Sequence, residues 1–140
     1  MGVLIEKIEK EEFPLNGIKV LLVEDNFFNQ LLAAKVLENW ECIVDVAANG
    51  NIAISKVKDN DFDIILMDIQ LPELNGYDAT SYIRSKIPEP KCNIPIIAMS
   101  ANIFEEEIKK CFECGMNDYV SKPFVEHILY EKILKAIQPS

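Results

Sequence analysis

The sequence predicts an α/β fold, a doubly wound parallel sheet of five strands with helices on both faces. Five short apolar runs have the length of strands: Lys19–Val23, Ile43–Ala47, Ile64–Met67, Ile94–Met99 and Tyr119–Val120. They alternate with five amphipathic stretches of helix length, at 27–39, 51–60, 77–86, 103–113 and 124–137. This alternation is typical of strand–helix–strand units, which build a parallel sheet. A chain of 140 residues has the size of one such domain.

Residues 1–16 stand apart from this pattern. They are charged, show no regular apolar spacing and are interrupted by Pro14. We interpret them as a linker or the remnant of an upstream domain, and we expect residues 17–140 to form the folded domain.

The composition of the strands predicts their order in the sheet. Val20–Val23 and Ile64–Met67 are uninterrupted apolar runs, as strands covered on both faces require. Ile43–Ala47 contains the charged Asp45, and Tyr119–Val120 is short; both features are typical of edge strands. With the second and fifth strands at the edges, the expected order is 2-1-3-4-5. The order reverses between strands 1 and 3, so a site is expected there at the carboxyl ends.

The first helix should begin after Asn26, whose side chain suits an N-cap. No glycine follows the helix, so we expect Asn39 to adopt the left-handed conformation at its end. Residues at helical spacing form the expected core stripe: Asn29, Leu32, Ala33, Val36, Leu37 and Trp40. That stripe leaves Phe27, Phe28 and Leu31 facing the cleft or solvent. Large exposed apolar side chains beside a site suggest a docking patch for a protein partner.

Charge and cysteine content argue against several classes of function. The formal net charge is -9, which would repel a nucleic-acid backbone, so direct nucleic-acid binding is not expected. No apolar run approaches the ~20 residues of a membrane-spanning helix. The 4 cysteines form no dense framework, as is typical of a reducing, cytosolic setting. Cys111 and Cys114 lack the further ligands of a structural zinc site, so we expect them simply to share a helix face.

Polar side chains follow the strands at the edge where the site is expected. They are Glu24 and Asp25 after the first strand, Asp68 after the third, Ser100 after the fourth and Lys122 after the fifth. Carboxylates in one cleft repel each other, by about 3 kcal/mol for a pair ~5 Å apart at an effective dielectric constant of ~20. Mg²⁺, which prefers oxygen ligands, removes this penalty. An aspartate held against Mg²⁺ and a lysine can attack phosphorus, and a serine can donate to a phosphoryl oxygen. The sequence therefore predicts an acyl phosphate on Asp68.

Four motifs together resemble those of the receiver (response-regulator) domains of two-component signalling. They are V-E-D-N at 23–26, L-M-D-I-Q-L-P at 66–72, S-A at 100–101 and Y-V-S-K-P-F at 119–124. The resemblance covers residues 18–137 and implies the flavodoxin-like receiver fold. It also implies that Asp68 accepts a phosphoryl group from a histidine kinase or a histidine phosphotransfer domain, and that the domain then switches conformation and slowly dephosphorylates itself. Asn75 and Trp40 depart from the commoner residues of the family, away from the chemistry.

The resemblance also implies a metal site and a fixed orientation for Lys122. The ligands of Mg²⁺, for which Mn²⁺ can substitute, would be Asp25, Asp68 and the backbone carbonyl of Gln70, with Glu24 binding through water. The Lys122–Pro123 peptide bond would be cis, although cis bonds are rare in general.

Two further pairs of residues take their roles from the resemblance. Ser100 and Tyr119 would form the pair that changes conformation on phosphorylation. Gln70 and Asn102 would flank the phosphoryl group and set its lifetime, since neutral amides orient a water molecule without deprotonating it.

We expect the domain to come from the end of a hybrid sensor histidine kinase and to exchange phosphate with a histidine phosphotransfer partner. No DNA-binding module follows the last helix, the charged segment around Pro14 suits a tether, and V-E-D-N-F-F-N-Q at 23–30 resembles that branch of the family. The domain would be a monomer or weak dimer in the cytoplasm, without membrane contact of its own, whether or not its parent protein is membrane-anchored.

Three alternatives have less support. An aspartyl phosphatase needs a second aspartate where this chain has Gln70, and an amide cannot act as a general acid. A flavin or nucleotide module needs a glycine-rich or hydroxyl-rich loop after the first strand, where Glu24-Asp25-Asn26 would repel phosphate. A scaffold that no longer takes phosphate would not need the complete acidic set. His127 lies in a predicted helix without kinase motifs, so no phosphohistidine is expected there.

Overall fold

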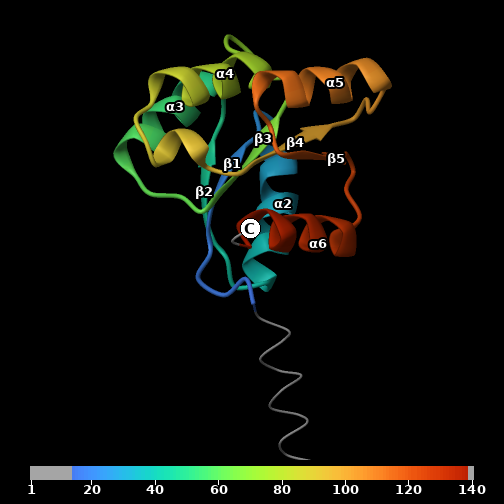
Figure 1. Ribbon diagram of the computed structural model, residues 1–140. Helices are drawn as coiled ribbons and strands as arrows, with labels where there is room; N and C mark the ends of the chain where they lie inside the picture. The colour runs from blue at the N-terminus through green and yellow to red at the C-terminus, as the bar shows by residue number, and fades with distance from the viewer. Residues whose placement is uncertain (1–13, 139–140) are drawn as a thin grey trace, which may run out of the picture.

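The structure, a computed structural model, describes residues 14–138. Within this range, Figure 1 shows one sheet with helices packed on both faces. Its five strands run parallel in the order β2-β1-β3-β4-β5. They are β1 (Lys19–Val23), β2 (Ile43–Ala47), β3 (Ile64–Asp68), β4 (Ile96–Ser100) and β5 (Asp118–Ser121). The predicted fold class and strand order are confirmed.

The helices divide between the two faces of the sheet (Figure 1). They are α2 (Phe27–Asn39), α3 (Gly50–Asp59), α4 (Gly76–Lys86), α5 (Glu105–Cys114) and α6 (Glu126–Ile137). One face is covered by α2 and α6, which contribute Ala33, Leu37, Leu129 and Ile133 to its core. The other face is covered by α3, α4 and α5, which contribute Val57, Ile83 and Cys111 among others.

The central strands carry the core. Every side chain of β3 and β4 is buried, and so is every side chain of β1 after Lys19. β2 is mostly half-buried and its first residue, Ile43, is 57% exposed. The continuous apolar runs therefore lie where both faces are covered, and the interrupted strand lies at an edge, as predicted.

Strand boundaries differ from the prediction mainly at β4. This strand starts two residues later than expected, because the amide of Ile94 donates to Lys91 in a short 3-10 helix, η1 (Lys91–Asn93), and Pro95 has no amide to donate. Its carboxyl end extends to Ser100, which pairs with Ser121, and β3 extends to Asp68, which pairs with Met99. Both polar residues are therefore held in the sheet itself.

The two ends of α2 differ in how well they were predicted. Asn26 is the N-cap, and its side chain accepts a hydrogen bond from the amide of Asn29 at 3.0 Å. The expectation for Asn39 is wrong, since it remains helical and Glu41 takes the left-handed conformation, with φ of 63°. The amide of Cys42 closes the end by donating to Leu37 at 3.1 Å.

The core stripe predicted for α2 is wrong at Leu32, which is 52% exposed. Ala33 and Leu37 are buried, while Asn29, Val36 and Trp40 are only half-buried. The helix approaches the sheet along the narrow line of Ala33 and Leu37, which leaves Leu32 on its flank. Phe27, Phe28 and Leu31 are 71%, 65% and 53% exposed, so the prediction that they lie outside the core is confirmed.

The loop between β3 and α4 folds tightly against the end of β3. Asn75 caps α4 by accepting from the amide of Asp78 at 2.9 Å, and the amide of Gly76 donates to Ile69. A Cβ atom at Gly76 would lie 2.3 Å from the carbonyl oxygen of Asp68. Only glycine permits this approach, which packs the loop against the residue at the centre of the predicted site.

Three further expectations can be compared with the structure. The Lys122–Pro123 peptide bond is cis, as predicted, and so is Glu89–Pro90. No helix within residues 14–138 has the length and apolar character to cross a membrane. Of the segment predicted to be a linker, residues 1–13 lie outside the described residues.

Candidate functional site

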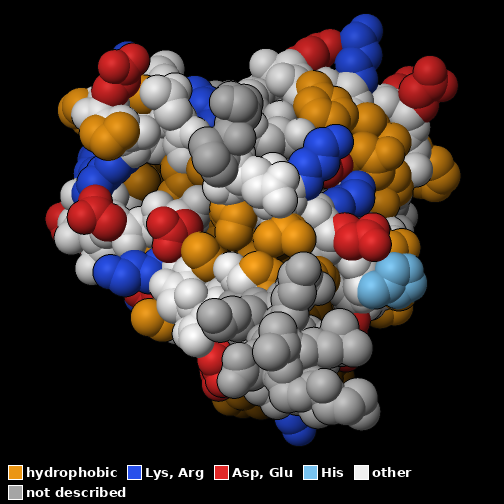
Figure 2. Space-filling view, turned by 60° about the horizontal axis from the view of Figure 1, so that its bottom comes forward, with side chains coloured by type: hydrophobic (Ala, Val, Ile, Leu, Met, Phe, Trp, Pro, Cys, Tyr) orange, Lys and Arg blue, Asp and Glu red, His pale blue; other side chains and the backbone are white. Residues whose placement is uncertain are grey.

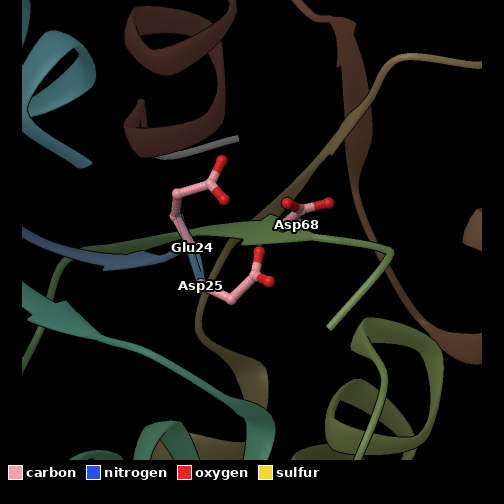
Figure 3. Close-up of side chains that lie close together, drawn as sticks. All are labelled: Glu24, Asp25 and Asp68. Carbon is pink, nitrogen blue, oxygen red and sulfur yellow. The ribbon is translucent and has the colours of Figure 1, made fainter. Parts of the chain in front are cut away.

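Three carboxylates meet at the carboxyl ends of β1 and β3 (Figure 3). Glu24 and Asp25 directly follow β1, and Asp68 is the last residue of β3. One carboxylate oxygen from each lies within 4.8 Å of the others. Glu24 and Asp68 are 2% and 5% exposed, whereas Asp25 is exposed to solvent. The acidic cluster predicted from the strand ends is therefore present.

Lys122, from the loop after β5, reaches into the cluster. Its Nζ lies 2.6 Å from Oε1 of Glu24 and 2.8 Å from Oδ2 of Asp68. Partial burial lowers the pKa of Lys122, but the hydrogen bonds and negative charges of Asp68 and Glu24 raise it by more, so the net pKa lies above the ordinary lysine value. The site therefore favours the ammonium form, which bridges the ends of β1 and β3.

The charges at the site fit a divalent cation. Three carboxylates against one ammonium group leave two negative charges without compensation within the cluster. The exposed Asp25 makes no side-chain hydrogen bond or salt bridge with residues 14–138, so its oxygens are free to bind a ligand. An all-oxygen donor set with one solvent-facing side suits Mg²⁺, which keeps several of its waters.

Backbone groups hold the buried carboxylates in place. Oδ1 of Asp68 accepts from the amide of Gln70 at 3.0 Å, and Oε2 of Glu24 accepts from the amide of Asn26 at 3.1 Å. The side-chain amide of Gln30 donates to the carbonyl oxygen of Glu24 at 2.6 Å. This last contact was not predicted, because sequence spacing does not show which way a side chain in the first turns of a helix will reach.

Ser100 ends β4 at the same edge of the sheet, but its hydroxyl bonds to the loop that follows this strand. Its hydroxyl donates to the carbonyl of Asn102 and accepts from the amide of Asn102, both at 3.0 Å. Ser100 is 5% exposed, while Asn102 and Gln70 are exposed. The two amide side chains thus belong to the loops after β4 and β3.

Tyr119 is held by side chains from the helices on both faces of the sheet. The ring of Phe112, in α5, meets it edge-on at 6.4 Å between centroids. Nζ of Lys132, in α6, lies 4.3 Å from the centre of the tyrosine ring and 3.1 Å from Asp118. Neither neighbour was predicted. Lys132 in particular lies on α6 and reaches around the edge strand β5 from the face of the sheet opposite to α5.

Cys111 and Cys114 lie in α5, and both are free cysteines. Cys111 is buried, and burial raises the pKa of its thiol to about 11. A thiol that stays protonated is a poor metal ligand, which agrees with the interpretation of this pair as structural.

A groove opens beside the acidic cluster, between α2 and the start of α6. Its volume is about 500 Å³, and Glu24 and Lys122 line it where it meets the cluster. Apolar side chains line most of the rest: Leu32, Ala33, Val36, Met99, Pro123 and Phe124. The wrongly assigned Leu32 therefore faces this groove rather than the core.

Most of the chain, residues 20–134, matches the response regulator receiver domain family. The chain belongs to the response-regulator receiver family. Hybrid signal transduction histidine kinase B of Dictyostelium discoideum is 39% identical to this receiver domain, over 93% of the chain and 7% of that protein. Probable histidine kinase 5 of Oryza sativa subsp. japonica is 35% identical, over 85% of the chain and 12% of that protein. The receiver domain therefore spans a small part of the curated relatives that it matches.

Solved receiver domains share the fold. One, from a sensor histidine kinase of Pseudomonas aeruginosa, is 38% identical with a TM-score of 0.80, covers 86% of this chain and 98% of its own, and holds a magnesium ion coordinated in its active site cleft. Another comes from a co-crystal structure of the Saccharomyces cerevisiae histidine phosphotransfer protein Ypd1 with the receiver domain of Ssk1. It is 31% identical with a TM-score of 0.78, over 87% of this chain and 90% of that one.

Proposed function

We propose that Asp68 accepts a phosphoryl group from a phosphohistidine, in a reaction that depends on Mg²⁺. The observation that carries this proposal is the setting of its carboxylate. Asp68 is nearly buried at the end of a central strand, within 4.8 Å of two further carboxylates, and its Oδ2 is 2.8 Å from Lys122. Such a carboxylate is oriented and charge-compensated, as a nucleophile toward phosphorus must be.

The transfer exchanges one bond for another. An oxygen of Asp68 attacks phosphorus, the oxygen–phosphorus bond forms and the phosphorus–nitrogen bond of the phosphohistidine breaks. The electron pair of the broken bond stays on the imidazole, which takes up a proton. Lys122 lies beside the attacking carboxylate, so its ammonium group can stabilise the charge of the phosphoryl oxygens.

Asp25, Asp68 and the backbone carbonyl of Gln70 would hold Mg²⁺, or Mn²⁺ in its place. Glu24 would bind the metal through a water molecule. Direct binding is less suitable because both of its carboxylate oxygens already accept hydrogen bonds, one from Lys122 and one from the amide of Asn26. Bound there, the metal would neutralise charge on the phosphoryl oxygens. The magnesium ion in the related Pseudomonas domain supports this assignment.

Ser100 and Tyr119 would change partners on phosphorylation. The hydroxyl of Ser100 now bonds to the backbone of Asn102, and the ring of Tyr119 packs against Phe112 and Lys132. A phosphoryl oxygen on Asp68 would compete for the serine hydroxyl. Movement of the Ser100 side chain toward the phosphoryl group would leave space into which the ring of Tyr119 turns.

Gln70 and Asn102 would set the lifetime of the acyl phosphate. Both belong to loops that follow strand ends at the site, and both side chains are exposed. Neutral amides can orient a water molecule but cannot deprotonate it, so we infer slow autodephosphorylation.

The exposed apolar residues of α2 would receive the phosphodonor protein. Phe27, Phe28 and Leu31 form the predicted docking patch, and the exposed Leu32 extends it toward the groove beside Lys122. The net charge of -9 favours a protein partner over a nucleic acid. On the face in Figure 2, basic side chains are interspersed with acidic ones, in keeping with this choice.

The partner would be a histidine kinase or a histidine phosphotransfer domain, and the parent protein a cytoplasmic or membrane-anchored hybrid histidine kinase. Two of the relatives are histidine kinases, and another receiver domain was crystallised with a histidine phosphotransfer protein. Residues 1–16 would link the receiver domain, as a monomer or weak dimer, to the rest of such a kinase.

Phosphotransfer from a labelled phosphohistidine protein tests this function. The wild-type domain should take up label in Mg²⁺ and lose it slowly afterwards, whereas Asp68→Asn should take up none. Equal uptake of label by the two proteins, or undiminished uptake by the wild type in excess EDTA, would contradict the proposal.

A further inference from the structure

The acidic turn that follows β1 consists of Glu24, Asp25 and Asn26, and two side-chain contacts tie it to α2: the cap bond from the amide of Asn29 to Asn26, and a bond from Gln30. Nε2 of Gln30 donates to the carbonyl oxygen of Glu24, with 2.6 Å between the two atoms. Gln30 is half-buried and is the fourth residue of α2. Side chains on a helix point back toward its N-terminus, so a glutamine at this position reaches over the cap to the turn before it.

That turn carries two of the three carboxylates. The amide of Glu24 still belongs to the sheet and donates to Ala47 at 3.0 Å, but its carbonyl lies beyond the last pair of the β1 ladder. Without Gln30, this carbonyl would lack its side-chain partner. The remaining contact within the turn is the bond from the amide of Asn26 to Oε2 of Glu24, at 3.1 Å.

Asp25 stands between these two anchor points. Its own side chain has no hydrogen-bond or salt-bridge partner among residues 14–138, so its direction is set by the backbone on either side of it. The peptide unit between Glu24 and Asp25 contains the carbonyl that Gln30 holds. Rotation of that unit would swing the Asp25 carboxylate relative to Asp68.

We propose that Gln30 is a positioning residue of the metal site, which aims Asp25 by holding the carbonyl of Glu24. The inference rests on the proposed function for the identity of the ion, Mg²⁺. It assigns Gln30 no contact with the metal or the phosphoryl group. Because Gln30 lies next to Leu31 of the docking patch, it also forms a direct connection from the docking helix to the acidic turn.

Gln30→Met tests the inference, since methionine matches glutamine in length and shape but has no donor. The variant should bind Mg²⁺ about three- to tenfold more weakly by calorimetry, the loss expected for one hydrogen bond. Labelling by acetyl phosphate should need more Mg²⁺ for half-saturation yet reach the wild-type rate at saturation. In the metal-free protein, the amide of Asn26 should exchange with solvent faster, because the turn has lost an anchor.

The matched control is Gln138→Met, the same substitution at an exposed residue after α6. It should leave Mg²⁺ affinity and amide exchange unchanged. Wild-type Mg²⁺ affinity in Gln30→Met would overturn the inference, even if its melting temperature fell, because Gln30 would then be merely structural. Equal loss of affinity in both variants would overturn it as well. Failure of the wild type to bind Mg²⁺ would instead overturn the proposed function, and the exchange rate of the Asn26 amide would still decide whether Gln30 holds the turn.

Discussion

Lys122 and Asp68 form a largely buried ion pair, with 2.8 Å between Nζ and Oδ2, although Asp68 ends β3 and Lys122 lies in the loop after β5. The same ammonium group bonds to Glu24, so one lysine pairs with two buried carboxylates. This arrangement gives the lysine a structural part in the site, beside the chemical part that we propose for it.

Replacement of Lys122 by methionine should separate its contribution to stability from its role in phosphorylation. The metal-free variant should lose about 1.5–3 kcal/mol of unfolding free energy, since hydrogen bonds to charged groups are lost and two buried carboxylates remain. Mg²⁺ should still bind and restore part of the stability, but labelling by acetyl phosphate should fall severely. Denaturant unfolding with and without Mg²⁺ measures the first effect. Wild-type labelling of Lys122→Met would contradict the role given to the lysine.

Removal of one charge at Asp25 should have opposite effects on stability and on metal binding. Asp25→Asn should weaken Mg²⁺ binding and slow phosphorylation. It should stabilise the metal-free protein by about 1 kcal/mol, because a repulsive carboxylate is gone. Glu131→Gln is a suitable control, since Glu131 is exposed in the middle of α6 and lies outside the cluster. A stability gain in the control as large as in Asp25→Asn would show that the gain reflects net charge alone.

A charged side chain in the docking patch on α2 should impair binding of the phosphodonor protein without affecting the chemistry at Asp68. Leu31→Glu should leave the fold and acetyl phosphate labelling intact, because Leu31 is 53% exposed and has no place in the acidic cluster. Transfer from a phosphohistidine protein should slow about tenfold, a loss of ~1.4 kcal/mol at an interface residue. Ile52→Glu, at a 40% exposed position on α3, provides the matched control. If both variants accept phosphate at the wild-type rate, α2 is not the docking helix.

Hydrolysis of the acyl phosphate should respond to the side chains of Gln70 and Asn102. A carboxylate at either position can accept a proton from the attacking water, whereas the native amides only orient it. Gln70→Glu and Asn102→Glu should therefore change the half-life of the phosphorylated domain by more than about twofold. Chase experiments after removal of the donor measure this half-life. Unchanged decay in both variants would rule out a lifetime role for these positions.

The fold could be predicted from the alternation of apolar strands with amphipathic helices. The acidic cluster could be predicted because the strand order alone brings its residues together. Parallel strands present their carboxyl ends at one edge, so Glu24, Asp25 and Asp68 must meet once the strand order is known. The surroundings of these residues could not be predicted in the same way. The bond from Gln30 to Glu24 depends on how far one side chain reaches, and the contact of Lys132 with Tyr119 depends on how α6 lies against the edge strand.

The errors on α2 have a related cause. Apolar residues occur on several sides of this helix, so spacing alone did not decide which of them face the sheet. The structure buries the line of Ala33 and Leu37 and leaves Leu32 in the groove toward α6. The helix ends at Asn39 as predicted, but the left-handed residue after it was misplaced, because Glu41 rather than an asparagine or glycine adopts that conformation.

The intact mass of the domain after incubation with acetyl phosphate tests the central claim most directly. In Mg²⁺, the wild type should gain one adduct of ~80 Da, the mass of a phosphoryl group, and EDTA should prevent it. Asp68→Asn should fold and gain none, since Glu24 and Asp25 remain but the neutral amide is too weak a nucleophile to attack phosphorus. An adduct on Asp68→Asn, or an adduct on the wild type that forms equally well in EDTA, would contradict the assignment of Asp68 as the metal-dependent phosphoacceptor.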